Sequence, residues 1–570
     1  MTQIESIEEK RQRILDSGGH LLVEGGPGSG KTTIALLKAD KIASSGALRN
    51  FQRLLFLSFA RATVSRVEEQ SRSIISQENK QYLEINTYHG FCWQLIQSFG
   101  YLIAPHRLLK LITPPSLAAK IAGLSEERIK QLKRSLLMEE GIIGFDLFAE
   151  MASSIIEQST KIVKIISAAY PFIIVDEFQD TDIFEWKLIR LMGQHSTIIA
   201  LADLEQRIYE FRGASVTRIP DFVSEFTPLR VDLGKENRRS PGTDIVQFGD
   251  DLLTGTNIGK KYKQVQIIPY RYYKGDTGKI SINSALSASI RRLRSAKPDG
   301  KWSIAVLVRR KLDTLNISTY LTSKKIEHDV IIDPEGPALA AVVISSLLQP
   351  ITTIEEDARI LLIQVIEHIK GRKGVNTTKA DMVFVNALET YLLTKKIKGK
   401  NRIELLTEIN RITDLRRSLL FIGVPEIDWL AVRDLFRQST SEALFNIFDD
   451  GKFVKLLHKG ALLSSRLSEM WRDTGNYHSA AQAVREALTQ EHFSMASKVY
   501  QGIYVMNIHK SKGKEFDEVI IWEEAHHPIV YPKSIDQGRL LLRVGVTRAR
   551  TYTTFLTPSW SPCILLSGTR

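Results

Sequence analysis

The sequence predicts an α/β protein of two lobes, each built on a parallel sheet covered by helices and each interrupted by a helical insertion. Three observations predict this class. Short apolar runs of strand length alternate with helical patterns in two separate parts of the chain. Two long stretches carry helical patterns only and are rich in charge. The 570 residues also exceed one ordinary core and suggest three or four subdomains.

The first lobe opens with an apolar strand at residues 21–24, a glycine-rich turn, and a helical pattern from Thr32 to about Ile42. Further strands are expected at residues 54–58, 83–86, 172–175 and 198–201. Residues 101–165 break this alternation with helical patterns and are interpreted as an insertion. The first lobe is therefore predicted to comprise residues 1–100 and 166–226.

The second lobe is predicted from a second alternating section that begins near Thr227 and includes the apolar run at residues 304–308. Strand patterns return at residues 502–508 and 518–522. Between these two parts the pattern is again helical. We therefore expect residues 227–345 and 496–570 to form the second lobe, with residues 346–495 as its insertion.

The composition limits the kinds of protein that the chain can be. Lys and Arg number 77 against 64 acids, a formal charge of +13, which fits a polyanionic partner but also occurs in proteins without one. Two cysteines, Cys92 and Cys563, are too few for a four-cysteine metal site. The polar start and the lack of a membrane-length apolar run predict a cytoplasmic protein without signal peptide or membrane span.

The glycine-rich turn fits the phosphate-binding pattern G-x-x-x-x-G-K-[ST], in the required context between a strand and a helix. Its backbone N–H groups and the helix start would hold phosphate oxygens. Lys31 is expected to reach the β- and γ-phosphates of ATP, and Thr32 to bind Mg²⁺. An accidental turn is disfavoured because spacing and context agree. The expected nucleotide contacts of this loop and the residue after it are Gly25, Gly26, Gly28, Ser29, Gly30, Lys31, Thr32 and Thr33.

Two acids, Asp176 and Glu177, directly follow the apolar strand at residues 172–175. Ligands of open α/β sheets bind at the carboxyl ends of strands, so these acids belong at the same edge as the glycine-rich turn. Asp176 is expected to bind Mg²⁺, either directly or through another ligand of the ion, and Glu177 to orient the attacking water. A merely solvated strand end is the alternative, which the nearby phosphate-binding pattern disfavours.

In addition to the glycine-rich turn, seven ordered segments resemble the helicase motifs of the UvrD/Rep/PcrA family of superfamily 1A, among them Asp-Glu-Phe-Gln-Asp-Thr at residues 176–181. The resemblance spans nearly the whole chain and implies two RecA-like lobes with subdomains 1B and 2B as the insertions. The further matching segments are Phe56 to Ala62, Thr87 to Gly90, Asp203 to Ala214, Asn237 to Ser240, Asn507 to Phe516 and Val544 to Ala549.

The resemblance also implies roles for single residues of the nucleotide site. Gln206 matches the glutamine that senses the γ-phosphate, and Arg239 and Arg548 match the two arginines that reach it from the second lobe. Such arginines stabilise the charge of a phosphoryl-transfer transition state, so hydrolysis should require the lobes to close. Gly513 and Glu515 match positions near the nucleotide sugar and phosphates; a turn glycine and a solvated acid are the alternative.

The resemblance further implies a channel for single-stranded nucleic acid. Aromatic side chains in such a channel stack on any base, at roughly 1–3 kcal/mol per base, which suits a motor that ignores sequence. For Tyr209 and Phe211 a place in the core is the alternative. The residues that match channel positions are Phe59, Thr87, His89, Tyr209, Phe211, Arg212 and His509.

A few positions depart from the family pattern. Arg238 stands where the family often has the tyrosine that stacks on adenine, and Thr33 where an arginine commonly follows the phosphate-loop threonine. The family also has a glutamine before the first strand that recognises adenine. Gln12 is the nearest candidate, although its spacing to Lys31 is slightly short. The departures concern the choice of nucleotide base rather than hydrolysis.

The sequence is compatible with three functions. The first is an ATP-dependent, 3′→5′ translocase and helicase on single-stranded or partly duplex DNA. The second is a nucleic-acid-stimulated ATPase that senses DNA ends or single strands and regulates a partner nuclease in anti-phage defence. The chain ends soon after the last motif, without room for a nuclease, and its compact size resembles the helicase-like subunits of Gabija-type systems. The third, a non-enzymatic binding module, is disfavoured by the complete catalytic set. DNA and RNA are not distinguished, because stacking and backbone contacts serve both.

Overall fold

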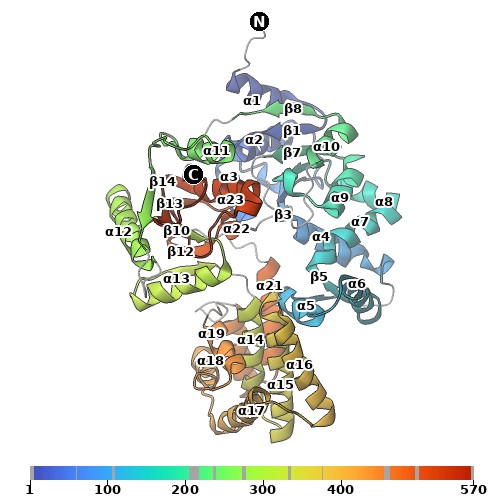
Figure 1. Ribbon diagram of the computed structural model, residues 1–570. Helices are drawn as coiled ribbons and strands as arrows, with labels where there is room; N and C mark the ends of the chain where they lie inside the picture. Colours follow the sequence, from blue (N-terminus) through green and yellow to red (C-terminus); the bar gives the residue numbers. More distant parts are fainter. Residues whose placement is uncertain are drawn as a thin grey trace. The chain divides into compact units, whose positions relative to one another are not determined.

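The computed structural model contains two compact units, each described by itself (Figure 1). Unit 1 comprises Met1–Ser98, Ala149–Ile332 and Met495–Arg570; unit 2 comprises Phe99–Phe148 and Asp333–Ser494. The structure describes residues 6–58, 61–104, 109–203, 217–234, 239–271, 278–331, 335–374, 377–452, 454, 462–493 and 500–566.

Unit 1 holds two parallel sheets. The first has the strand order β3-β2-β6-β7-β1-β8, and every described pairing in it is parallel. Its order makes β1 and β6 flank β7, so the segments that follow all three strands leave the same edge of the sheet. The strands are β1 (Leu21–Glu24), β2 (Leu54–Ser58), β3 (Leu83–Thr87), β6 (Phe172–Val175), β7 (Thr197–Ala202) and β8 (Leu229–Asp232).

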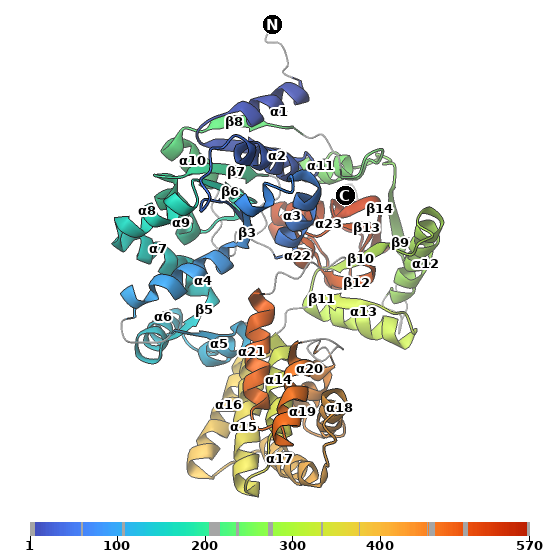
Figure 2. The same cartoon turned by 180° about the vertical axis from the view of Figure 1, so that it is seen from behind.

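Helices lie on both faces of this sheet (Figures 1 and 2). Alternate strand residues such as Val23, Phe56 and Ile199 pack with α1, α2 and α3 on one face, while α9 contacts β7 and packs with α10. Because both faces are buried, the strands are apolar throughout, as the sequence predicts. The helices are α1 (Ile7–Asp16), α2 (Lys31–Ser44), α3 (Arg61–Ile74), α4 (Tyr88–Phe99), α7 (Phe148–Gln158), α8 (Thr160–Ala169), α9 (Ile183–Gly193) and α10 (Arg218–Phe226).

The second sheet has the order β11-β12-β10-β13-β14-β9, again with parallel pairings. The α/β fold class with helix-flanked parallel sheets is therefore confirmed. The strands are β9 (Val265–Tyr270), β10 (Ser303–Val308), β11 (Asp329–Ile331), β12 (Gly502–Asn507), β13 (Phe516–Trp522) and β14 (Ala549–Pro558). The helices are α11 (Ile245–Thr254), α12 (Lys279–Ala296), α13 (Lys311–Ser323), α22 (Ile508–Ser511) and α23 (Ile535–Val546).

The first sheet extends past the expected lobe boundary at residue 226. The segment Leu229–Asp232 forms β8 and pairs in parallel with β1, from Leu21 opposite Leu229 to Glu24 opposite Asp232. The pairing satisfies the outer edge of β1, which would otherwise be left without partners. The chain thus crosses to the second sheet only after β8.

Asp251 near the end of α11 fastens the turn between this helix and β9. Its carboxylate accepts hydrogen bonds from Gln247 Nε2 (2.9 Å), Thr256 Oγ1 (3.0 Å), Lys260 Nζ (2.8 Å) and Tyr262 Oη (2.6 Å). Burial alone would raise the pKa of Asp251, but these donors, Lys260 first, lower it to about 2.

Replacing the buried Asp251 with alanine should therefore lower the free energy of unfolding by about 2 kcal/mol, because four hydrogen bonds to its carboxylate are lost while the more exposed donors can turn to water. In the unaltered chain this stabilisation should persist above the ordinary aspartate pKa of about 3.9 and fade as the pH falls toward 2. Urea denaturation of both proteins measures the difference. Asp299→Ala, an exposed aspartate with one described local bond, is the control and should cost far less.

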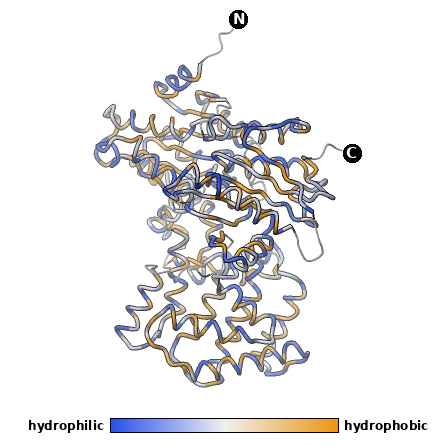
Figure 3. The backbone as a smooth tube through the Cα atoms, turned by 90° about the vertical axis from the view of Figure 1, so that its left-hand side faces the viewer, coloured by the Kyte–Doolittle hydropathy of each residue, from blue (hydrophilic) through white to orange (hydrophobic). Residues whose placement is uncertain are grey.

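Unit 2 is a helical bundle that gathers parts of both predicted insertions. Nearly all of α14 is buried, because the helix is apolar on every side. In Figure 3 hydrophobic and hydrophilic residues alternate along the other bundle helices, as amphipathic helices require. The helices are α5 (Pro114–Ile121), α6 (Glu126–Ser135), α14 (Glu335–Leu348), α15 (Ile354–Gly371), α16 (Lys379–Thr394), α17 (Lys400–Ser418), α18 (Pro425–Asp434), α19 (Glu442–Gly451), α20 (Leu462–Thr474) and α21 (Ala480–Phe493).

The described elements differ from the predicted insertions in three ways. Helix α5 packs on α14 and α15, so closely that a Cβ at Gly371 would lie 2.8 Å from the Pro115 carbonyl oxygen. The stretch 101–165 is also not purely helical, since β4 (Lys110–Ile112) and β5 (Ile142–Gly144) form a short parallel pair. Helices α7 and α8 of that stretch fall in unit 1. The division into four subdomains stays a prediction.

Within the described residues, no helix combines the length and apolarity that crossing a bilayer requires.

Candidate nucleotide site

The glycine-rich loop (residues 25–32) connects β1 to α2 at the carboxyl edge of the first sheet. Gly28 and Gly30 have φ of 79° and 90°, which side chains disfavour, and Gly30 caps the start of α2. Lys31 Nζ donates to the carbonyl oxygens of Gly25 (2.6 Å) and Gly26 (3.0 Å). The loop therefore holds an ammonium group over a helix start, an arrangement that attracts anions.

Asp176 and Glu177 follow β6 at the same edge. Glu177 has φ 52°, the left-handed region that costs energy for any residue but glycine, and such strain collects at functional sites. Its N–H donates to Asp176 Oδ1 at 3.0 Å. Asp176 Oδ2 is buried without a hydrogen-bond partner among the described residues. Burial first, and then the neighbouring Glu177, raises the pKa of Asp176 to about 6.

Two lysines keep Glu177 ionised. Burial alone would raise the pKa of Glu177, but Lys512 and then Lys31 hold it below its usual value. Gln179 Nε2 donates to Glu177 Oε2 at 2.6 Å, and Gln179 Oε1 accepts the N–H of Asp203 at 3.0 Å. Gln179 thus fixes the Glu177 carboxylate to the segment after β7. A carboxylate fixed in this way can orient a water molecule or accept its proton.

Two arginines belong to the part of unit 1 that holds the second sheet. Arg548 lies just before β14 and donates to the Val544 carbonyl (2.9 Å) and to Thr547 Oγ1 (3.2 Å). Burial and, next, the charge of Arg239 lower the pKa of Arg548. Arg239 in turn donates to the Thr547 carbonyl oxygen at 3.1 Å. Two guanidinium groups are therefore held close together, an arrangement that binds polyanions well.

Ion pairs join the two sheets within unit 1. Lys512, which follows β12 and α22, is buried and pairs with Asp180, and it lies 3.9 Å from Glu177 Oε2. Arg543 on α23 lies 3.7 Å from Asp203 Oδ1. These contacts bring the carboxyl edges of the two sheets together around Glu177.

The residues present fit a nucleotide with its Mg²⁺. Ser29 Oγ and Asp176 Oδ2 are buried polar oxygens without a hydrogen-bond partner in the described part of the chain. Mg²⁺ is commonly held by one or two protein oxygens together with substrate phosphates, and Thr32 and Asp176 can supply these. No group of three or more His, Cys, Asp or Glu that could hold a metal occurs among the described residues. The two ligands stay a prediction.

Comparison with known proteins gives the family resemblance independent support. The model of the UvrD/REP helicase N-terminal domain matches residues 7–132 and 119–227. The chain is 20% identical to the probable DNA helicase II homolog of Rickettsia conorii, over 95% of the chain and 91% of that relative. It is also 20% identical to the ATP-dependent DNA helicase PcrA of Bacillus subtilis, over 95% and 81%. The chain is UvrD/Rep/PcrA-like. The ATP-dependent DNA helicase UvrD1 of Mycobacterium tuberculosis is 22% identical over 45% of the chain and 40% of that relative.

Several predicted residues of this UvrD/Rep/PcrA-like chain have defined positions outside the centre described above. Thr33 is exposed on the first turn of α2. Gly513 has φ 76° in the turn before Glu515. Gln12 is exposed on α1 and donates to Asp16 Oδ2 at 2.9 Å; its contact with adenine stays a prediction.

The predicted channel residues are described only in part. Thr87 ends β3 and its Oγ1 accepts the N–H of Gly90 at 2.9 Å, His89 lies on α4, and His509 lies on α22. All three lie at or just after the carboxyl ends of strands of the two sheets, and their binding of nucleic acid stays a prediction. The predicted residues outside the described part of the chain are Phe59, Gln206, Tyr209, Phe211 and Arg212.

Several residues that the structure brings to this site had no role in the sequence prediction. Gln179, Asp180 and Lys512 lie inside the segments that resemble helicase motifs, and this place in the sequence could have indicated a role for them. Arg66 and Arg543 have no comparable signal, since each is one arginine among many on helices.

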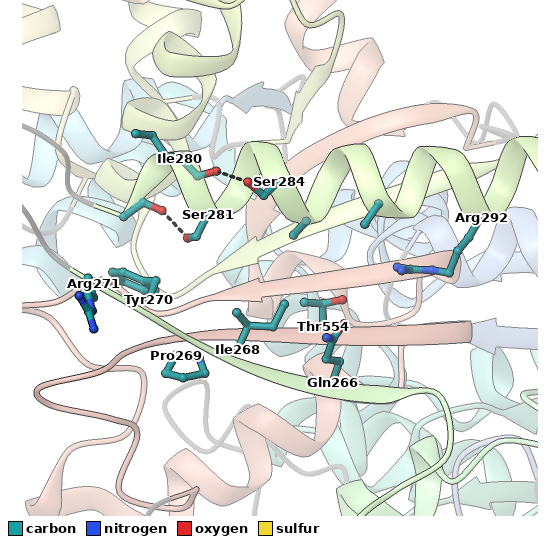
Figure 4. A pocket seen from close by; sticks show the side chains of 13 residues that line it. Gln266, Ile268, Pro269, Tyr270, Arg271, Ile280, Ser281, Ser284, Arg292 and Thr554 are labelled. Atoms are coloured by element: carbon teal, nitrogen blue, oxygen red, sulfur yellow. Dashed lines mark hydrogen bonds between the residues drawn. The ribbon is translucent and has the colours of Figure 1, made fainter.

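One cavity of unit 1 lies away from the predicted residues. It measures about 490 Å³ and lies between the edge strand β9 and α12. Figure 4 shows Gln266, Ile268 and Tyr270 along the strand, with Ser284 and Arg292 on the helix above. Arg292 donates hydrogen bonds to both carboxylate oxygens of Glu518, so a ligand in the cavity could engage Arg292 only by breaking these bonds. None of the residues that line this cavity belongs to the nucleotide site.

Proposed function

We propose that the chain is an ATP-dependent motor that moves 3′→5′ along single-stranded DNA and can separate a duplex. One observation carries this proposal: in unit 1, buried ion pairs such as Lys512 with Asp180 join the first sheet, which carries the glycine-rich loop and Glu177, to the part of the chain after β8, which carries Arg239 and Arg548. A site divided between two sheets can couple hydrolysis to their relative movement.

Each group has a role in the proposed hydrolysis. Lys31 and the start of α2 bind phosphate oxygens, and Thr32 and Asp176 would hold Mg²⁺, which would neutralise phosphate charge there. Glu177, kept ionised by Lys512 and Lys31, orients the water. Arg239 and Arg548 stabilise the charge that develops during phosphoryl transfer. Because these arginines belong to the part of the chain that holds the second sheet, hydrolysis proceeds fully only while that part is closed onto the first sheet.

The deciding experiment uses purified chain, Mg²⁺-ATP and forked DNA with either a 3′ or a 5′ single-stranded arm. We expect single-stranded DNA to stimulate hydrolysis and only the substrate with the 3′ arm to be unwound. Stimulated hydrolysis without unwinding would instead favour the ATPase that senses DNA ends and regulates a partner nuclease. No hydrolysis with any strand would refute both enzyme proposals. An RNA strand of the same sequence tests the preference for DNA.

A further inference from the structure

Arg66 is a residue of the nucleotide site that neither the motifs nor the composition indicated. It lies on α3, directly after β2 of the first sheet, and its Nη1 is 2.6 Å from Glu515 Oε1. Glu515 directly precedes β13 of the second sheet. The two side chains are only 20% and 15% exposed. Arg66 therefore forms a shielded ion pair between the sheets.

The carboxylate of Glu515 is shared among several arginines. Arg239 Nε lies 2.9 Å from Oε1, the same oxygen that Arg66 contacts, while Arg550 lies 3.3 Å from Oε2. Burial alone would raise the pKa of Glu515, but Arg239, Arg66 and Arg550 hold it well below its usual range. Glu515 is thus a buried anion at every ordinary pH, and it needs a positive partner.

Arg66 is also close to the acids after β6. Burial alone would lower the pKa of Arg66, but the charges of Glu515, Asp176 and Glu177 more than compensate and raise it. Its guanidinium is therefore a permanent cation between the acids of the first sheet and Glu515 of the second.

We propose that Arg66 is a positioning residue that neutralises Glu515 so that Arg239 can leave this carboxylate and bind a nucleotide phosphate. The inference rests on the proposed function, in which Arg239 contacts phosphate. A guanidinium cannot serve Glu515 Oε1 and a phosphate with the same N–H groups at once. If Arg66 were absent, moving Arg239 would remove the shielded partner of Oε1, and of the described ion pairs of Glu515 the one with Arg550, which is 48% exposed, would remain. Arg66 removes that penalty.

The test measures the affinity of the full chain for a fluorescent, non-hydrolysable ATP analogue with Mg²⁺. Arg66→Gln should weaken binding about tenfold, the loss expected for one hydrogen bond to a charged group. In a Glu515→Gln background the same change should have no further effect, since no carboxylate remains to neutralise. Arg66→Lys keeps the charge and should retain most of the affinity. Arg72→Gln, an exposed arginine on the same helix, should bind as the unaltered chain does.

Three outcomes would overturn the inference. These are unchanged affinity in Arg66→Gln, an equal loss in the Glu515→Gln background, and a loss in Arg66→Lys as large as in Arg66→Gln. Strand-stimulated hydrolysis by the unaltered chain is measured in parallel. If the analogue binds but no hydrolysis occurs, the motor proposal fails and the binding comparison still judges Arg66. If the analogue does not bind at all, both fail.

Discussion

Replacing Glu177 with glutamine should lower strand-stimulated ATP hydrolysis by about 10²–10⁴-fold, the range that a positioned general base contributes. The change keeps the shape of the side chain and removes its charge. That charge is what Lys512 and Lys31 stabilise when they hold the pKa of Glu177 below its usual value. Steady-state phosphate release with saturating single-stranded DNA measures the effect.

Binding of Mg²⁺-ATP should survive the same substitution, because Lys31 and the glycine-rich loop are untouched. The loss should therefore appear in kcat rather than in KM. Glu84→Gln is the matched control, since Glu84 lies on β3 and accepts the Tyr170 hydroxyl, away from the site. If Glu177→Gln retained hydrolysis within a few fold of the unaltered chain, Glu177 would not be the base.

Local patterns in the sequence predicted much of the fold. The strand at residues 21–24, the loop after it and the start of α2 follow from an apolar run, glycines that adopt positive φ, and a helical pattern, all within a few residues. The same holds for β6 and the acids behind it. These elements could be predicted because their own residues, and not distant partners, determine their structure.

Elements that depend on distant partners were not predictable in this way. Strand β8 has only one fully buried residue, Val231, and exists because β1 offers it an edge. The pairing of β4 with β5 likewise depends on two three-residue segments meeting across the intervening helices α5 and α6. The packing of α5 on α14 joins parts of both predicted insertions, which no local pattern could indicate.

The site shows the same division. Lys31, Asp176 and Glu177 were predicted because each follows a strand at the edge where ligands bind. The contacts that join the sheets were not: Lys512 and Asp180 are 332 positions apart, and Arg66 and Glu515 are 449 positions apart. Motif order predicted that the two halves belong to one site, but only the fold shows which charge meets which.

Arg548→Gln should reduce kcat for ATP hydrolysis by about 10³-fold or more, the effect of an arginine that stabilises phosphoryl-transfer charge. Arg548 is 2% exposed and is held by the Val544 carbonyl and Thr547, so its guanidinium loses little freedom when the charge develops. Because this stabilisation is used in the transition state, affinity for Mg²⁺-ATP should change far less than kcat.

The experiment separates this role from that of Arg239. Single-turnover hydrolysis and nucleotide binding are measured on Arg548→Gln, on Arg239→Gln and on the control Arg294→Gln, an exposed arginine of α12. Arg239 exchanges Glu515 for phosphate in the scheme above, so its loss should weaken binding as well as catalysis. Arg548 is held by the Val544 carbonyl and Thr547 within its own part of the chain, so its loss should fall mainly on catalysis. Equal losses of binding in both variants would mean that the two arginines act as one phosphate clamp and not in separate steps.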